Sequence, residues 1–290
     1  MSWHNKVLWT EGMFLKPHHF QQQERYLEWL VHQSTASVVP YPWGWQEIVL
    51  DVEKLKQGKV AVQRASGVMP DGTTVSIPDE DPPPTPLEVG EDFRDEEVML
   101  VIPLARNRLP EMALGKSEDV LARYYGEHSS AESAVVDIKG EAELQLARKW
   151  SRLSGRNQNL GDFACLGVTK VRERRPDGEV VLDNDYIPSM LNAMRDSRLS
   201  GYVEEIHGLL RQRSEAVAAR VAAGGKGGVA EVADFLLLQM VNRTEPVFRH
   251  FATVASVHPE SLFTSCLALA GELSTFTKPE KRPGTYPIYR

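Results

Sequence analysis

The spacing of apolar residues changes twice along this 290-residue chain, and these changes limit what it can fold into. In residues 17–36 and again in 199–276, apolar residues recur at spacings of three and four, which is typical of amphipathic helices. Between Trp45 and Asp183 they alternate at a spacing of two, which is typical of strands. The pattern predicts a multidomain α and β protein in which a β region lies between helical regions.

Turn sequences divide the β region into short strands. Pro70-Asp71-Gly72 and Pro176-Asp177-Gly178 predict tight hairpins, because glycine readily adopts the positive φ that such turns need. The run Val98-Met99-Leu100-Val101-Ile102 is apolar throughout and is expected at the centre of a sheet, while residues 46–52 are expected to form one of the flanking strands. Short strands separated by turns predict an antiparallel β-sandwich over residues 37–185.

The helical regions are expected at the two ends of the chain. An extended arm should precede a helix that has Pro17 in its first turn and runs to about Ala36, so residues 1–36 form one segment. Residues 186–290 predict an antiparallel bundle of three helices, joined in part by the glycine-rich connector 224–228. Because three helices leave one flank of a bundle open, we expect the chain to be a fragment of a longer protein.

Charge is distributed unevenly along the chain. Residues 79–97 hold nine acids and one base, a local charge of −8, whereas the whole chain carries −7 and the remainder therefore +1. Since no basic region exists to hold phosphates, nucleic acid is not expected as a partner. The acidic residues lie among the prolines 82–84 and 86, so we expect them to form a solvated loop rather than a paired-carboxylate site.

Cysteine content and hydropathy indicate a cytoplasmic protein. Cys165 and Cys266 lie far apart, and two cysteines are too few for a secreted disulfide scaffold, so both are expected to be reduced, buried thiols. The longest apolar run, Phe235-Leu236-Leu237-Leu238, is far too short to span a membrane, and no signal peptide is recognisable.

Sequence patterns for catalysis are incomplete. Gly115-Lys116-Ser117 has Pro110 where a phosphate-binding loop needs glycine, and Lys226 in the glycine-rich connector is followed by another glycine. His18 and His19 are neighbours on a helix and point about 100° apart, so they are expected to pack or to contact a partner rather than share a metal ion. We expect no catalytic residues, no metal and no cofactor, and therefore not an enzyme.

The start of the chain is the strongest candidate for a binding site. Its apolar residues follow neither a strand nor a helix pattern, and each would stabilise the protein by about 1.5–3 kcal/mol if fully buried. A partner protein or a second subunit could bury them, and packing on the chain's own sandwich is the alternative. The candidate partner-binding residues are Trp9, Met13, Phe14, Leu15, Pro17, His19 and Phe20.

Two segments resemble one known bacterial family. The first is Trp9-Thr10-Glu11-Gly12-Met13-Phe14-Leu15-Lys16-Pro17-His18-His19-Phe20-Gln21-Gln22-Gln23, and the second begins at Val241-Asn242-Arg243-Thr244-Glu245-Pro246 and continues through His258-Pro259-Glu260-Ser261-Leu262-Phe263. In sequence, order and spacing they are similar to the TssK (ImpJ/VasE) family of type VI secretion baseplate proteins. The resemblance extends over essentially the whole chain, but family members continue for more than a hundred further residues.

The resemblance implies a structural adaptor without enzymatic activity. Members of the family are homotrimers with a phage-like shoulder sandwich, and their N-terminal part binds the baseplate wedge built from TssF and TssG. Their C-terminal domain, which this chain lacks, docks the baseplate on the membrane complex through TssL and TssM. The protein is then expected in the cytoplasm, at the inner face of the bacterial cell envelope when assembled.

Two other functions are compatible with the residues alone. A carbohydrate-binding β-sandwich of the phage receptor-binding type could use the aromatic faces of Trp3, Trp9, Trp43 and Trp45 for stacking on sugars. A hydrolase that uses Asp79, Glu80 and Asp81 is a weaker alternative, because these carboxylates lack the apolar surroundings that would raise a pKa.

Overall fold

A computed structural model of the chain describes residues 3–107, 109–115, 121–133, 140–223 and 228–289. It divides into two compact units, Met1–Ser189 and Met190–Arg290. The first unit holds the strands and the second holds three long helices, which confirms the predicted mixed α and β class. The finer prediction, an antiparallel sandwich followed by an antiparallel bundle, stays a prediction. Across the described ranges, no helix is long and apolar enough to cross a membrane.

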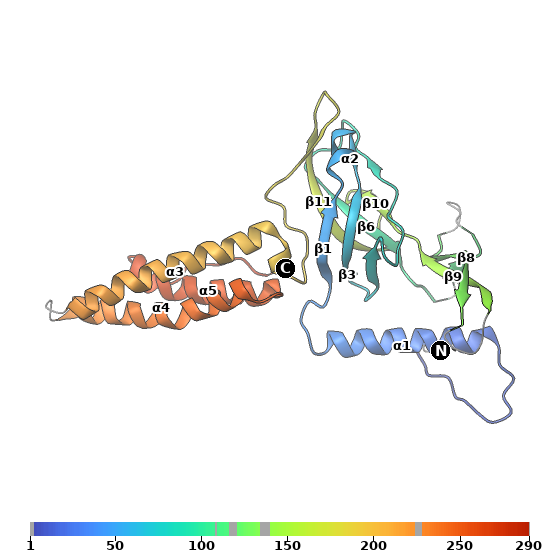
Figure 1. The fold of residues 1–290 in the computed structure, drawn as a ribbon, viewed down its shortest axis with the longest axis horizontal. Coiled ribbons are helices and arrows are strands. Elements are labelled where there is room, and N and C mark those ends of the chain that lie inside the picture. Colours follow the sequence, from blue (N-terminus) through green and yellow to red (C-terminus); the bar gives the residue numbers. More distant parts are fainter. Residues whose placement is uncertain (1–2, 108, 116–120, 134–139, 224–227, 290) are drawn as a thin grey trace. The chain divides into compact units, whose positions relative to one another are not determined.

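Helix α1 spans Pro17–Ala36, the bounds that the sequence predicts (Figure 1). Pro17 occupies the first turn, where its missing N–H would have no helical partner. The backbone N–H of Lys16 donates to His19 Nδ1 at 3.0 Å, so His19 caps the start of the helix. The proline and this cap fix where α1 begins.

The first sheet has the order β1-β3-β4, with antiparallel strands β1 (Gly44–Leu50), β3 (Val62–Val68) and β4 (Thr74–Ile77). The β3–β4 turn contains Gly72 at φ 87°, which confirms the predicted hairpin. Between β1 and β3 lie helix α2 (Val52–Lys56) and strand β2 (Lys59–Val60), which pairs with β5 (Leu87–Glu88). The prediction that the first strand continues to Val52 is wrong, because the carboxylate of Asp51 caps α2.

The second sheet has the order β10-β6-β11-β12 and holds the apolar run from Val98 to Ile102 at its centre. Its strands are β10 (Arg152–Gly155), β6 (Glu96–Pro103), β11 (Phe163–Arg174) and β12 (Val180–Leu182), all antiparallel. Trp45 of β1 is fully buried, and its indole N–H donates to the backbone oxygen of Gly167 in β11 at 2.6 Å. Gly167 has to be small there, because an added Cβ would overlap the Tyr186 hydroxyl.

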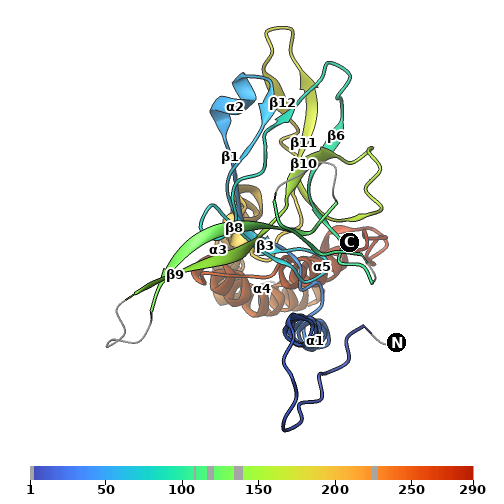
Figure 2. The same cartoon turned by 90° about the vertical axis from the view of Figure 1, so that its right-hand side faces the viewer.

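The third sheet, order β7-β8-β9, includes a long hairpin. Strand β8 (Tyr124–Glu132) pairs antiparallel with β9 (Glu141–Lys149), and the short β7 (Met112–Ala113) pairs with β8 in parallel. Figures 1 and 2 show β8 and β9 as a ribbon that extends away from the other strands of this unit. Because β8 mixes polar, glycine and small residues without clear alternation, its sequence carries little strand signal.

The acidic stretch 79–97 is not simply the solvated loop that its composition suggests. Asp81 is buried, and its carboxylate accepts the backbone N–H of Ser76 at 2.9 Å and lies 3.0 Å from Lys149 Nζ. A buried carboxylate would be costly unless it were paired, and here the ammonium group of Lys149 and the Ser76 amide satisfy it. The prediction is therefore wrong for Asp81, whereas its neighbours Asp79 and Glu80 are exposed.

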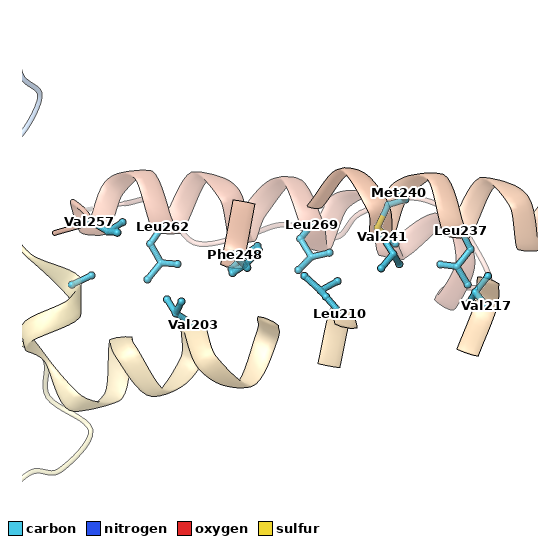
Figure 3. Packing of buried hydrophobic residues seen from close by; sticks show 11 residues of the cluster. Val203, Leu210, Val217, Leu237, Met240, Val241, Phe248, Val257, Leu262 and Leu269 are labelled. Atoms are coloured by element: carbon cyan, nitrogen blue, oxygen red, sulfur yellow. The ribbon is translucent and has the colours of Figure 1, made fainter. Parts of the chain in front are cut away.

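The second unit consists of a short 3₁₀ turn (Ala193–Arg195) and helices α3 (Ser197–Ala223), α4 (Val229–Thr253) and α5 (Pro259–Thr277). Figure 3 shows their shared core, in which side chains of all three helices meet. Pro246 lies inside α4. Residues 224–227 of the predicted connector lie outside the described residues, as do Lys116 and Ser117.

Polar contacts also join these helices. The guanidinium of Arg243 in α4 pairs with Glu272 of α5. The side chain of Asn242 accepts a hydrogen bond from the Ser214 hydroxyl of α3 at 2.9 Å, so it joins α4 to α3. Both cysteines are free as expected, but they are half-buried rather than buried.

Candidate partner-binding site

The N-terminal arm folds back along α1. The side-chain amide of Gln22 donates to the backbone oxygen of Trp3 at 3.0 Å and to that of Asn5 at 2.7 Å. Nearer the turn of the arm, the ring of Trp9 lies 6.3 Å from that of Phe20. Arm and helix therefore run antiparallel, as the loop beside α1 in Figures 1 and 2 shows.

Ring contacts hold the same face of α1 against the arm. The guanidinium of Arg25 lies 5.1 Å from the Trp3 ring centroid, and the ring of His4 stacks on that of Trp29 at 5.5 Å. Such cation–π and stacked contacts are worth about 0.5–1.5 kcal/mol each. Together they give the arm a defined path without a buried core.

Most of the predicted partner-binding residues are exposed in the described part of the chain. Phe14 is 82% exposed, and Trp9, Leu15, Pro17 and Phe20 are exposed as well. The other two, Met13 and His19, are half-buried. The structure brings Trp9 close to His19 and Phe20 at the turn between arm and helix, and none of the seven residues is buried.

An adjoining face of α1, which shares Arg25 with the face on the arm, contacts the sheets of its unit through polar groups. Arg25 forms an ion pair with Glu111, just before β7, at 3.1 Å. The imidazole of His32 lies against Gly72 in the β3–β4 turn, so closely that a Cβ at this glycine would overlap the ring. Two separate parts of the β region thus position α1, and neither contact buries its apolar side chains.

An ion pair between the buried Arg123 and the half-buried Asp71 lies close to that contact. Arg123 directly precedes β8. Its guanidinium donates to Asp71 Oδ2 at 3.0 Å, to the Pro103 backbone oxygen at 2.7 Å and to the Thr73 hydroxyl. Burial works to raise the pKa of Asp71, but the charge of Arg123 and hydrogen bonds from Thr73 outweigh it and lower that pKa. Near this pair, desolvation raises the pKa of Glu28 on α1, although Arg123 opposes the shift.

The third face of α1 is open and apolar. Phe20, Leu27 and Val31 follow at spacings of seven and four and so lie on one side of the helix, with Leu30 beside them. All four are exposed, Val31 to 65%, and no residue of α1 is buried. The sequence predicts this apolar stripe. The spacing of apolar residues does not indicate, however, whether the stripe faces the chain's own core or another molecule.

Other predicted binding features take different places. Trp45 is fully buried and cannot stack on a sugar, and the ring of Trp3 packs against the guanidinium of Arg25. His19 uses Nδ1 in the cap of α1, while His18 is exposed. Over the ranges that the structure describes, no three His, Cys, Asp or Glu side chains come together in a way that could hold a metal ion.

Comparison with known proteins identifies the family. Residues 19–290 match the family described as Bacterial Type VI secretion, VC_A0110, EvfL, ImpJ, VasE. This chain belongs to that family. The type VI secretion system baseplate component TssK1 of Pseudomonas aeruginosa is 43% identical over 289 residues, a match that covers 100% of this chain and 65% of TssK1. The chain thus spans about two thirds of the length of this VasE-family relative.

Solved structures of the family have the same fold. A crystal structure of TssK superposes with a TM-score of 0.94 at 36% identity, over 99% of this chain and 65% of that one. The TssK–TssF–TssG baseplate subcomplex, seen by cryo-electron microscopy, contains a chain that matches with a TM-score of 0.85 at 23% identity, over 99% of this chain and 92% of that one. At that identity the second likeness concerns the fold alone.

Proposed function

We propose that this chain is the N-terminal and middle part of a structural adaptor in a type VI secretion baseplate, and that it is not an enzyme. Membership of the VasE family and the relative named as a baseplate component support this role. The observation that carries it is the apolar surface at the arm and α1, where large apolar side chains are exposed.

The proposed partner of this surface is a wedge of TssF and TssG. A TssK is known in a TssK–TssF–TssG subcomplex, and the present chain has its fold. The contact residues are then Trp9, Met13, Phe14, Leu15, Pro17, His19 and Phe20. Five of these side chains are exposed and apolar, which suits a protein partner with an apolar groove.

The remaining architecture of the proposal follows the family resemblance. The chain forms a homotrimer in the cytoplasm, with residues 37–185 as a β-sandwich shoulder and 186–290 as part of an antiparallel helical bundle. Docking on TssL and TssM, at the inner face of the cell envelope, belongs to the part of the relatives that this chain does not span.

Co-expression with TssF and TssG, followed by light scattering on the eluting peaks, tests the proposal. We expect co-elution, and for the free chain a mass near 98 kDa, three times 32.5 kDa. The double variant Phe14→Ala, Phe20→Ala should fold but lose the wedge, whereas Leu114→Ala, at an 85% exposed leucine outside the arm, should retain it. Elution of the unaltered chain apart from TssF and TssG would overturn the proposed wedge contact.

A further inference from the structure

The outer edge of β9 is an unusual feature of the β8–β9 hairpin. In the sheet order β7-β8-β9, β9 comes last, so within the described part of the chain one of its edges has no neighbouring strand. Residues 141–147 are all exposed, and β9 contains neither proline nor glycine. A long exposed edge of this kind is a template for pairing with another strand, and monomeric proteins normally interrupt or cover it.

The hydrogen-bond pattern shows which backbone groups this edge offers. Trp150 N–H donates to the Arg123 oxygen at 2.9 Å and Ser133 N–H to the Gly140 oxygen at 3.4 Å, one at each end of the ladder. Hydrogen-bonded pairs in an antiparallel ladder recur at every second residue. The even-numbered residues of β9 therefore bond to β8, and the odd-numbered ones direct N–H and C=O outwards: Glu141, Glu143, Gln145, Ala147 and Lys149.

We propose that β9 pairs antiparallel with β9 of a second copy of this chain, about a two-fold axis at Gln145. In this register odd-numbered residues face odd-numbered ones, so every outward amide group meets a complementary group. Glu141 lies opposite Lys149 of the second copy, and Leu144 lies opposite Leu146 of the second copy. A parallel, in-register pairing would instead place each glutamate beside its own equivalent, which is unfavourable.

Side chains on the two faces of β9 support a second copy as the occupant. Leu144 and Leu146 are exposed on one face, where a cross-strand leucine pair from the second copy would cover them. On the other face, Lys149 Nζ donates to the Thr74 oxygen at 2.8 Å and lies 3.0 Å from Asp81 Oδ2. An ammonium group has three N–H bonds, so Lys149 has one left for Glu141 of the second copy.

This contact differs from the one that forms a trimer. A two-fold contact uses the same patch on both subunits and closes with two copies, so it cannot generate a ring of three. If the proposed homotrimer forms, the β9 contact would link two trimers to each other. It does not depend on TssF or TssG, and its failure would leave the proposed wedge contact standing.

Cysteine cross-linking in the full 290-residue chain tests the register. Two residues facing each other in a hydrogen-bonded pair have Cα atoms about 5.5 Å apart, within the range of disulfides. Under mild oxidation, Gln145→Cys should give a covalent dimer of 65 kDa, twice 32.5 kDa. The matched control Glu143→Cys faces Ala147 of the second copy and should remain uncross-linked, as should the unaltered chain with its half-buried Cys165 and Cys266.

Light scattering across a range of concentrations gives a second, independent result. Gln145→Pro removes an N–H that β8 does not use, so the hairpin should persist while self-association weakens about tenfold or more. Gln145→Ala retains the N–H and should associate like the unaltered chain. Equal cross-linking of Gln145→Cys and Glu143→Cys would overturn the proposal. So would an association that Gln145→Pro leaves unchanged while circular dichroism shows an intact fold.

Discussion

Helices α1 and α4 have similar lengths and comparable apolar stripes, yet they use them in opposite ways. In α4, four apolar residues are buried against the other helices of its unit, namely Leu237, Met240, Val241 and Phe248. In α1 no residue is buried, and its contacts with the sheets are made by Arg25 and His32. An amphipathic period therefore establishes that a helix has an apolar face, but not which molecule that face contacts.

The difference has an energetic consequence. Each large apolar side chain buried in α4 stabilises the fold by about 1.5–3 kcal/mol, so this helix is part of what holds its unit together. The exposed stripe on α1 contributes little of that energy within the chain, and the same burial remains available for association. Substitutions in the two helices should separate folding from binding.

The largest expected effect is that of Phe248→Ala in α4. Phe248 is fully buried, so its truncation leaves a cavity and should lower the free energy of unfolding by about 3–5 kcal/mol. Urea unfolding followed by circular dichroism measures this. Phe20→Ala in α1 is the counterpart and should change stability by less than about 0.5 kcal/mol. A large loss of stability from Phe20→Ala would remove the contrast between the helices.

The sequence predicts the elements of this fold better than it predicts their surroundings. The bounds of α1, the two Pro-Asp-Gly hairpins and the central strand around Leu100 follow from local rules, because each depends on turn chemistry or on unbroken apolarity. The burial of Asp81 does not, because it depends on Lys149, which is distant in sequence. Predicting such pairs requires knowledge of the tertiary fold.

The candidate site, too, can be predicted from the sequence only in part. The seven arm residues could be selected because their pattern suits neither helix nor strand, whereas Leu27, Leu30 and Val31 look like an ordinary core-facing stripe. Nothing local distinguishes them from the buried residues of α4. The sequence does not indicate the ion pair of Asp71 with Arg123 either, since Asp71 has a sufficient explanation as a turn residue.

A second test concerns the ion pair between Asp71 and Arg123, which lies in the β region near α1. Asp71→Asn leaves Arg123 without its carboxylate partner and should cost roughly 2 kcal/mol at pH 7. Because the folded pKa of Asp71 lies below its ordinary value of 3.8, this stabilisation is present above that pH and is lost as the pH falls through the folded pKa. Unfolding measured from pH 7 to about pH 2 should therefore show a constant difference down to about pH 4 and a shrinking one below it. A difference that is constant with pH would contradict this assignment.

A smaller effect is expected from releasing the arm. Gln22→Ala removes both hydrogen bonds to the arm's backbone and should cost about 1 kcal/mol locally, while the midpoint of global unfolding barely changes. Hydrogen exchange of residues 3–9 should become faster. Gln21→Ala, at an exposed position of the same helix, is the control and should leave that exchange as it was.

The smallest effect should have the opposite sign. Desolvation raises the pKa of Glu28, so folding favours its protonated form, and the charged form weakens α1's contact with the sheets. A group whose folded pKa is raised contributes stability below its unfolded pKa and loses that contribution as the pH rises through the folded value. Glu28→Gln should therefore raise the melting temperature slightly at pH 7 and have no effect below about pH 4.5, the ordinary glutamate value. If instead the substitution lowers the melting temperature at pH 7, attraction between Glu28 and Arg123 outweighs the desolvation of Glu28. Both Glu28 and Arg25 would then attach α1 to the sheets by electrostatic attraction.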